Sequence, residues 1–277
     1  MKYLGVSRAE LYSPGRVSGD AAVFRAVAAE LERHGHEVIC ITEQELVSNG
    51  IPADVDGIFQ MARSREALSV LDGAHIPVTN TVQAVRNCGR AAQTDLLQGT
   101  GLIPESIICS TAGVPDGWHI YPCWIKRADS HAVEQDDVQY IENAAQSAVA
   151  MRGFAGRGLK ECVLQAHVKG WLVKFYGVRG MGLTDCYAAS PVDGKFGLER
   201  YNDQPDCASV DIQALTAVTE RISEILGVDI YGGDAVVGVL THHLHSTEHA
   251  SEVDVVLGRV VRRIVTEQAH QAQGRHP

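Results

Sequence analysis

Two strand-like runs that each carry a lysine constrain this chain most. Residues 163–178 predict two short strands with a tight connection at Lys169 and the following glycine, because Val, Phe, Tyr and Trp favour the pleated backbone. Lys174 lies inside the second, apolar run. A buried ammonium is costly to desolvate unless an anion meets it. Lys126 has the same setting in residues 123–127, so the two lysines together indicate a site for nucleotide phosphates.

The first 78 residues alternate between strand-like and helix-like segments. Strands are predicted at residues 3–6, 38–41, 57–61 and 76–78, the second of them buried. One helix is expected to follow Asp20 as its cap, and another to cover residues 64–71. This order predicts a small, doubly wound parallel sheet. No Gly-x-Gly-x-x-Gly follows the first strand, so the pattern does not indicate dinucleotide binding.

The remaining chain predicts a second, α+β unit over residues 79–265. Its expected helices are residues 82–97, 137–151 and 211–226, with an amphipathic end at 253–265. Its expected strands are residues 106–109, 121–126, the pair within 161–178, and 230–239. We expect residues 116–176 to form a lid, 185–206 a long loop and 266–277 a frayed tail.

Composition restricts the class of protein without naming it. Among 277 residues the formal net charge is −10, which disfavours nucleic acid or an anionic membrane as partner. The seven cysteines are scattered and form no Cys-x-x-Cys pair, which favours reduced thiols over disulfides or zinc. No apolar run approaches the length of a membrane span. We therefore expect a cytoplasmic protein.

Five segments resemble the ATP-grasp superfamily in order and spacing. They are residues 79–90, 96–104, Trp124-Ile125-Lys126, Gln165-Ala166-His167-Val168 and 227–234. The superfamily holds glutathione synthetase, D-alanine–D-alanine ligase and the ribosomal-protein glutamate ligases. The resemblance covers about residues 78–237, and the N-terminal part more loosely. It implies a preceding Rossmann-like domain and an ATP-grasp fold, in which two α+β subdomains clasp the nucleotide.

The resemblance also implies which residues contact the phosphates. Lys126 and Arg90 take the two phosphate-binding positions, and Lys174 corresponds to a basic strand residue that faces the nucleotide. Many relatives have lysine where this chain has Arg90, and a guanidinium can bind phosphate through two nitrogens. The alternatives are a strand-edge lysine that reaches solvent and an arginine on a solvated helix face.

The adenine is expected at a hinge between the two subdomains. Gln165, Ala166, His167 and Val168 match this hinge, and the main chain of Ala166 and Val168 would contact the adenine edge. In the loop after Lys126, His131 is a candidate contact for the γ-phosphate or the acceptor. The alternative for His131 is a loop histidine in solvent.

The family's magnesium site is only partly recognisable. Asp234 matches the first carboxylate, and Glu248 stands at the expected spacing for the second, but Ala250 replaces the usual asparagine. Asp254 is a fallback ligand. Four histidines crowd this segment, and they indicate either a transition-metal site or an irregular surface: His242, His243, His245 and His249.

The resemblance implies an ATP-dependent ligase that joins a carboxylate to an amine through an acyl phosphate. Its cofactors would be ATP and Mg²⁺, its partners small-molecule or peptide substrates, and a homodimer is left open. Two alternatives remain: a nucleotide-binding regulatory protein without catalysis, and a small-molecule kinase of the same fold. Three arginines are candidates for binding an anionic substrate: Arg16, Arg63 and Arg179.

Overall fold

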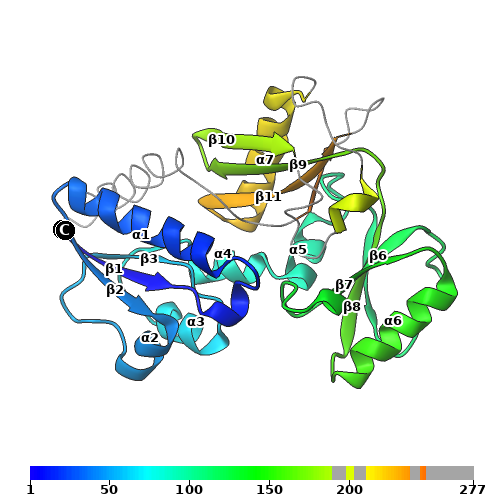
Figure 1. Ribbon diagram of the computed structural model, residues 1–277, viewed down its shortest axis with the longest axis horizontal. Coiled ribbons are helices and arrows are strands. Elements are labelled where there is room, and N and C mark those ends of the chain that lie inside the picture. The colour runs from blue at the N-terminus through cyan, green and yellow to red at the C-terminus, as the bar shows by residue number, and fades with distance from the viewer. Residues whose placement is uncertain (189–197, 203–209, 238–243, 248–277) are drawn as a thin grey trace.

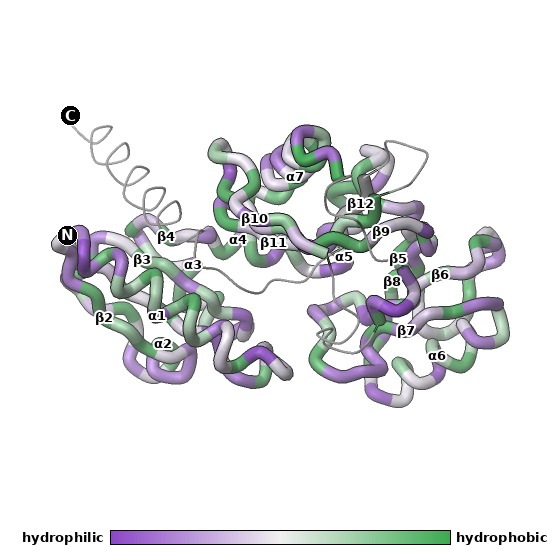
Figure 2. Tube along the Cα trace, turned by 45° about the horizontal axis from the view of Figure 1, so that its top comes forward, coloured by the Kyte–Doolittle hydropathy of each residue, from purple (hydrophilic) through white to green (hydrophobic). Residues whose placement is uncertain are grey.

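The computed structural model describes residues 1–188, 198–202, 210–237 and 244–247. These residues form three four-stranded sheets with helices packed against them (Figure 1). The first sheet and the lid sheet lie at opposite ends of the molecule, and α4, α5 and the third sheet lie between them (Figures 1 and 2). No helix in the described ranges is long and apolar enough to cross a membrane.

The first sheet is parallel and doubly wound, as the alternation predicted. Its strands are β1 (Lys2–Ser7), β2 (Glu37–Thr42), β3 (Gly57–Gln60) and β4 (Val78–Thr79), in the order β2-β1-β3-β4. Helix α1 (Val17–Arg33) packs on Tyr3 and Phe59 of one face. Helices α2 (Glu43–Asn49) and α3 (Arg65–Asp72) pack on Leu4 and Ile58 of the other.

Two local predictions in this sheet were wrong. Asp20 does not cap α1, because the cap position is Arg16 and Asp20 lies in the first turn, buried and hydrogen-bonded by Arg8 and Ser13. Strand β2 is at the edge of the sheet and is half exposed, so its apolar run overstated its burial. The helix expected at 64–71 is α3, which Ser64 caps by accepting from the Ala67 amide.

The lid sheet is antiparallel and is covered by one helix. It contains β5 (Ser106–Ser110), β6 (Cys123–Arg127), β7 (Val138–Ile141) and β8 (Glu161–Ala166), in the order β5-β8-β6-β7. Helix α6 (Ala144–Gly156) buries Met151 and Phe154 against it. The helix predicted from residue 137 was wrong in its first part: residues 138–141 alternate as a strand, and Asn143 caps α6.

The two strands that we predicted as a pair within the lid belong to different sheets, and the second of them lies in the third sheet. It contains β9 (Trp171–Val178), β10 (Gly182–Ala188), β11 (Ile230–Val237) and β12 (Leu244–Thr247), in the order β10-β9-β11-β12. Strand β9 pairs with β10 and β11 rather than with β8, so residues 167–170 connect two different sheets.

Three helices and a short turn complete this region. Helix α7 (Ile212–Leu226) is capped by Asp211, close to its predicted bounds. The single helix predicted for residues 82–97 is instead two helices, α4 (Val82–Asn87) and α5 (Arg90–Leu97). Helix α4 ends at Cys88, which is its C-cap, and Gly89 is the N-cap of α5. A short 3-10 turn, η3, covers Leu198–Tyr201.

Asn80 fastens the first sheet to the third. Its side chain accepts from the amides of Asp229 and Ile230, at 2.7 and 2.9 Å, and donates to the Ile230 carbonyl at 2.8 Å. Tyr176 and Val178 of β9 also share a hydrophobic cluster with α1 and the first sheet. The two sheets therefore pack as one unit at this point.

Candidate active site

Two cavities adjoin where the three sheets meet. The smaller, of about 110 Å³, lies between the lid sheet and the third sheet. The larger, of about 470 Å³, lies between the ends of β1 and β3, the loop 129–133 and the third sheet. Lys174 lines the larger cavity and Asp234 the smaller, and their side chains form an ion pair of 3.4 Å between Nζ and Oδ1. This pair marks the junction of the cavities.

The smaller cavity gathers most of the residues that the sequence singled out. They come from α5, β6, the end of β8, the segment after it, and β11: Arg90, Lys126, Gln165, Ala166, His167, Val168 and Asp234. These positions are far apart in sequence, and the fold brings them together around one cavity. The assignment of roles to them stays a prediction.

The two cations at the lid end are held by polar neighbours. Lys126 projects from β6 and donates to Gln165 Oε1 at 2.7 Å, and Gln165 donates in turn to Ser106 Oγ at 3.0 Å. Arg90 opens α5, is buried, and donates to the Asp137 carbonyl at 3.4 Å. Both positively charged groups therefore have defined positions on the cavity wall, as phosphate ligands require.

The hinge side of the smaller cavity has an aromatic wall made by Trp124 and His167. Trp124 Nε1 donates to His167 Nδ1 at 3.2 Å, so the proton of the neutral imidazole lies on Nε2. Burial, helped by Lys169, lowers the pKa of His167, which favours that neutral form. Tyr140 and Tyr201 stack with ring centroids 4.0 Å apart, and Trp124 packs edge-on against both. The two tyrosines support this wall from outside the cavity lining.

One backbone amide of the predicted hinge, residues 165–168, donates no hydrogen bond to the described residues. The Ala166 amide donates to the Glu105 carbonyl at 2.8 Å, and the Val168 carbonyl accepts from Asn202 at 3.2 Å. The Val168 amide donates to no residue within the described ranges. Of the groups predicted to contact an adenine edge, the Val168 amide is thus available.

A buried cluster at the junction carries two carboxylates for one ammonium. Lys174 on β9 faces Asp234 across the β9–β11 ladder and lies 3.7 Å from Glu199 of η3. All three residues are at most 9% exposed. Burial raises the pKa of Asp234 to about 7, because the opposing effect of Lys174 is smaller and Glu199 adds repulsion. The cluster therefore has room for one more positive charge.

Two oxygen atoms of this cluster suit a divalent cation. Asp234 Oδ1 and Glu199 Oε2 are buried and accept no hydrogen bond from the described residues. Carboxylate oxygens are the ligands that Mg²⁺ prefers. The described ranges hold no group of three metal-ligating side chains, and Glu248 and Asp254 lie outside them. The side chains of the four predicted histidines also lie outside the described part of the chain.

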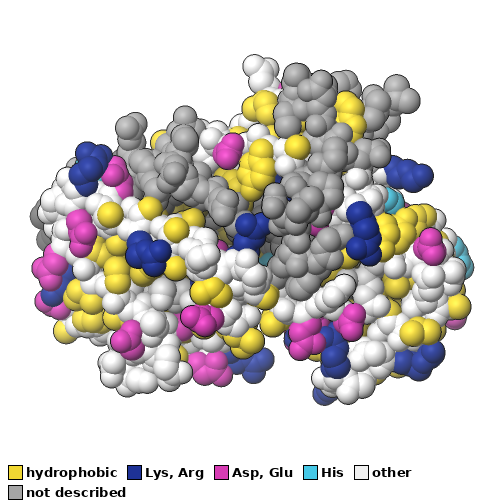
Figure 3. Space-filling model, in the orientation of Figure 1, with side chains coloured by type: hydrophobic (Ala, Val, Ile, Leu, Met, Phe, Trp, Pro, Cys, Tyr) yellow, Lys and Arg dark blue, Asp and Glu magenta, His cyan; other side chains and the backbone are white. Residues whose placement is uncertain are grey.

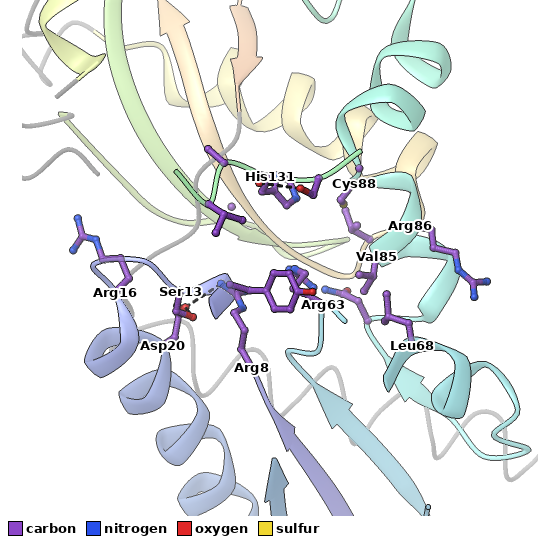
Figure 4. A pocket seen from close by; sticks show the side chains of 18 of the residues that line it. Arg8, Ser13, Arg16, Asp20, Arg63, Leu68, Val85, Arg86, Cys88 and His131 are labelled. Carbon is purple, nitrogen blue, oxygen red and sulfur yellow. Dashed lines mark hydrogen bonds and ion pairs between the residues drawn. The ribbon is translucent and has the colours of Figure 1, made fainter. Parts of the chain in front are cut away.

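The larger cavity contains other predicted residues. His131 lies on the loop that roofs it, and Arg16 and Arg63 line its floor (Figure 4). His131 is therefore on the side of an acceptor, next to Lys174, rather than in the smaller cavity. Arg179, the third candidate for an anionic substrate, pairs with Asp229 and lines neither cavity.

The sequence analysis missed three residues of this region. Glu199 belongs to a turn-rich stretch in which no periodicity distinguishes it from solvated acids. Arg8 and Glu43 directly follow strands β1 and β2, and position after a strand was the only available signal. Their burial comes from tertiary contacts, which a single sequence does not display.

Comparison with known proteins identifies the fold. No family model matches the sequence, and no curated protein matches it. D-alanine–D-alanine ligase from Bacillus anthracis, complexed with ATP, is 13% identical with a TM-score of 0.70, over 100% of both chains. A RimK domain ATP-grasp protein from Sphaerobacter thermophilus is 17% identical with a TM-score of 0.66, over 95% of this chain and 99% of that one.

A further D-alanine–D-alanine ligase, from Coxiella burnetii, is 9% identical with a TM-score of 0.71, over 99% of this chain and 98% of that one. The class that the architecture defines is that of mixed α/β proteins in which three sheets meet around two adjoining cavities. Within that class the chain has the ATP-grasp fold, as the resemblance predicted.

Proposed function

We propose that this protein is an ATP-dependent ligase that joins a carboxylate to an amine. The observation that carries the proposal is the junction of the two cavities, where Lys174 faces one cavity and its ion-pair partner Asp234 faces the other. Phosphoryl transfer needs a nucleotide and an acceptor to meet where positive charge neutralises the phosphates; here Lys126, Arg90, Lys174 and a magnesium ion held by the carboxylates would supply that charge. The three neighbours of similar fold are ATP-grasp proteins, two of them ligases.

ATP would occupy the smaller cavity. The adenine would lie against the aromatic wall, with its edge at the Val168 amide and its ring near His167. The phosphates would run past Lys126 and Arg90 towards Lys174. Lysine and arginine stabilise the charge that develops on the transferred phosphoryl group, and their fixed positions avoid reorganisation during the step.

The reaction consists of two transfers. An acceptor carboxylate oxygen attacks the γ-phosphorus of ATP, the bond to the β–γ bridging oxygen breaks, and ADP leaves with that oxygen. An amine then attacks the carbonyl carbon of the acyl phosphate. The carbon–oxygen bond to the phosphate breaks, inorganic phosphate leaves, and the amine nitrogen releases a proton to solvent.

Magnesium would be held by Asp234 and Glu199, with Glu248 as the further ligand proposed from the sequence. When bound, Mg²⁺ neutralises phosphate charge. Lys174 forms ion pairs with both carboxylates, at 3.7 Å from Glu199 and 3.4 Å from Asp234. We also propose the cytoplasm as the compartment, and none of the six cysteines in the described ranges forms a disulfide there.

Calorimetric titration of ATP tests the nucleotide site. We expect binding by the parent protein that strengthens with Mg²⁺, and a loss of about tenfold or more in Lys126→Ala, because hydrogen bonds to charged groups are worth about 1.5–3 kcal/mol. Lys160→Ala removes an exposed lysine that lines neither cavity and is the control. Equal affinity in Lys126→Ala and Lys160→Ala would contradict the site.

Product analysis then separates the ligase from the two alternatives. ADP release that needs both a carboxylate and an amine supports the ligase. ADP release with a hydroxyl acceptor alone supports a kinase. ATP binding without ADP release over a broad acceptor screen supports a regulatory nucleotide-binding protein.

A further inference from the structure

The larger cavity is basic in an acidic protein. The chain has a formal net charge of −10, and acidic side chains are spread over the face that Figure 3 shows. The residues that line the cavity nevertheless include six cationic and two acidic ones, and the side chain of Arg86, one of the six, points away (Figure 4). The cationic residues are Arg8, Arg16, Arg63, Arg65, Arg86 and Lys174, and the acidic ones are Asp20 and Asp129. A cavity of one sign concentrates ligands of the opposite sign.

Arg8 carries a charge that its surroundings only partly compensate. Its side chain is 13% exposed, and Nη1 donates to Asp20 at 3.0 Å while Nε donates to the Met61 carbonyl at 3.4 Å. Nη2 donates to no residue of the described ranges. Burial, and then repulsion from Arg63, lower the pKa of Arg8 to about 10 although Asp20 and Glu43 oppose the shift. An anion placed between the two guanidinium groups would relieve that repulsion.

Arg63 has no carboxylate partner in the described part of the chain. Its one hydrogen bond is from Nη1 to the neighbouring Ala62 carbonyl, at 3.1 Å. Arg65, at the exposed rim, likewise has no ion pair with a described residue. Figure 4 shows Arg8 and Arg63 near the centre of the cavity, below His131, whereas Arg86 points away from it. Arg86 pairs with Asp72 at 2.8 Å.

Glu43 fixes the positions of the two loops that carry Arg8 and Arg63 relative to each other. It is 3% exposed, and it accepts from the Ala9 and Arg63 amides with Oε1, at 2.8 and 3.2 Å, and from the Ser64 amide with Oε2 at 2.8 Å. One carboxylate thus fixes the backbone after β1 and the backbone after β3. This positions Arg8 and Arg63 on one wall without neutralising either guanidinium by a direct hydrogen bond.

We propose that this wall binds a second acidic group of the acceptor, so that the substrate is a diacid. One carboxylate is activated beside Lys174, and a second oxyanion, carboxylate or phosphate, is held by Arg8 and Arg63. Guanidinium groups bind both oxyanions through paired N–H donors. The identification of the larger cavity as the acceptor site rests on the proposed function, whereas the anion site itself rests on the cavity alone.

Binding of matched small acids to the free protein tests the inference. The probes are glutarate, with two carboxylates, 4-phosphonobutyrate, with one carboxylate and one phosphonate standing for a phosphate, and valerate, with one carboxylate, titrated calorimetrically at constant ionic strength. We expect saturable binding of glutarate or 4-phosphonobutyrate, and at least tenfold weaker binding of valerate. Whichever of the two dianions binds more tightly identifies the second group as carboxylate or phosphate.

Three variants locate the binding. Arg63→Gln should weaken the dianion about tenfold to a hundredfold, since a hydrogen bond between two charged groups is lost. Arg65→Gln, a rim variant in case Arg63→Gln fails to fold, should weaken it severalfold. Arg86→Gln, which changes an arginine that points away, should bind as the parent does. Equal dianion binding by Arg63→Gln and Arg86→Gln overturns the inference, and so does failure of every probe to bind the parent.

Titration of ATP into the same samples keeps the two proposals apart. ATP binding without dianion binding overturns the diacid site and leaves the proposed nucleotide site standing. Dianion binding that Arg63→Gln weakens, in a protein that does not bind ATP, supports the anion site and contradicts the ligase. In an active preparation, Arg63→Gln should raise the KM for the diacid and leave the KM for ATP unchanged.

Discussion

Two buried carboxylates have opposite surroundings, one in the lid sheet region and one at the junction of the two cavities. In the lid, Asp137 is fully buried and both of its oxygens accept hydrogen bonds, from Arg127, Arg157 and the amides of Val133 and Glu134. At the junction, Asp234 is almost as buried, but it shares one lysine with Glu199 and leaves Oδ1 without a hydrogen bond from the described residues.

The difference distinguishes a carboxylate whose hydrogen bonds are satisfied from one whose hydrogen bonds the described residues leave incomplete. Burial alone would raise the pKa of Asp137, but the amide and guanidinium donors outweigh it and lower that pKa to about 2. Burial raises the pKa of Asp234 to about 7. A buried ionised group that its own protein does not satisfy reduces stability, and such groups are concentrated where a ligand completes the contacts.

The largest expected effect is the loss of the satisfied carboxylate. Asp137→Ala removes the acceptor of two arginines and two backbone amides, and we expect it to lower the free energy of unfolding by about 3–5 kcal/mol. Urea denaturation measures this directly. A change below about 1 kcal/mol would mean that Arg127 and Arg157 find other partners, and the contrast with Asp234 would then disappear.

Acid should remove the same stabilisation without a substitution. Because the pKa of Asp137 is lower in the folded protein than in the unfolded chain, the unfolded chain binds the proton first as pH falls. The stabilisation is complete above about pH 5 and is lost as pH falls towards about 2, with a total of about 2 kcal/mol. Unfolding curves between these pH values should show that slope in the parent and a shallower one in Asp137→Asn.

Asp234→Asn should stabilise the folded protein, whereas Asp137→Ala should destabilise it. The raised pKa of Asp234 means that its ionised form costs stability, and this cost accumulates as pH rises from about 4 to about 7. In magnesium-free buffer at pH 8 we expect the variant to melt above the parent, by an amount that shrinks at pH 5. The same variant should lose the Mg²⁺ dependence of ATP affinity. A lower melting temperature at pH 8 would show that Asp234 is structural.

The smallest effect is expected for an exposed partner of the same arginine. Asp129 binds Arg127 Nε at 2.7 Å, but its side chain is 57% exposed. Surface ion pairs contribute about 0.2–1 kcal/mol, so Asp129→Ala should change the free energy of unfolding by less than about 1 kcal/mol. It is the matched control for Asp137→Ala in the same urea series. Equal losses in the two variants would remove burial as the explanation.

Much of the fold follows from pattern, and the unsatisfied site does not. The parallel first sheet and α7 follow from periodicity and capping residues, and the smaller cavity gathers segments whose order resembled a known family. Strand β7 was mistaken for helix because residues 138–141 directly precede a true helix. Glu199 had no signal at all, since its burial depends on η3 lying against Lys174, a contact made across the fold.

The hydrogen bonds that Asn80 makes between the end of β4 and the start of β11 determine a distance within the larger cavity. Arg8 and Arg63 belong to the first sheet and Lys174 to the third, and this link together with the shared cluster of Tyr3, Phe24 and Tyr176 joins those two sheets. The distance from the two arginines to the lysine is therefore set by the packing of these two sheets and does not depend on the position of the lid sheet. An acceptor that reaches from one end to the other is selected by the length between its two acidic groups.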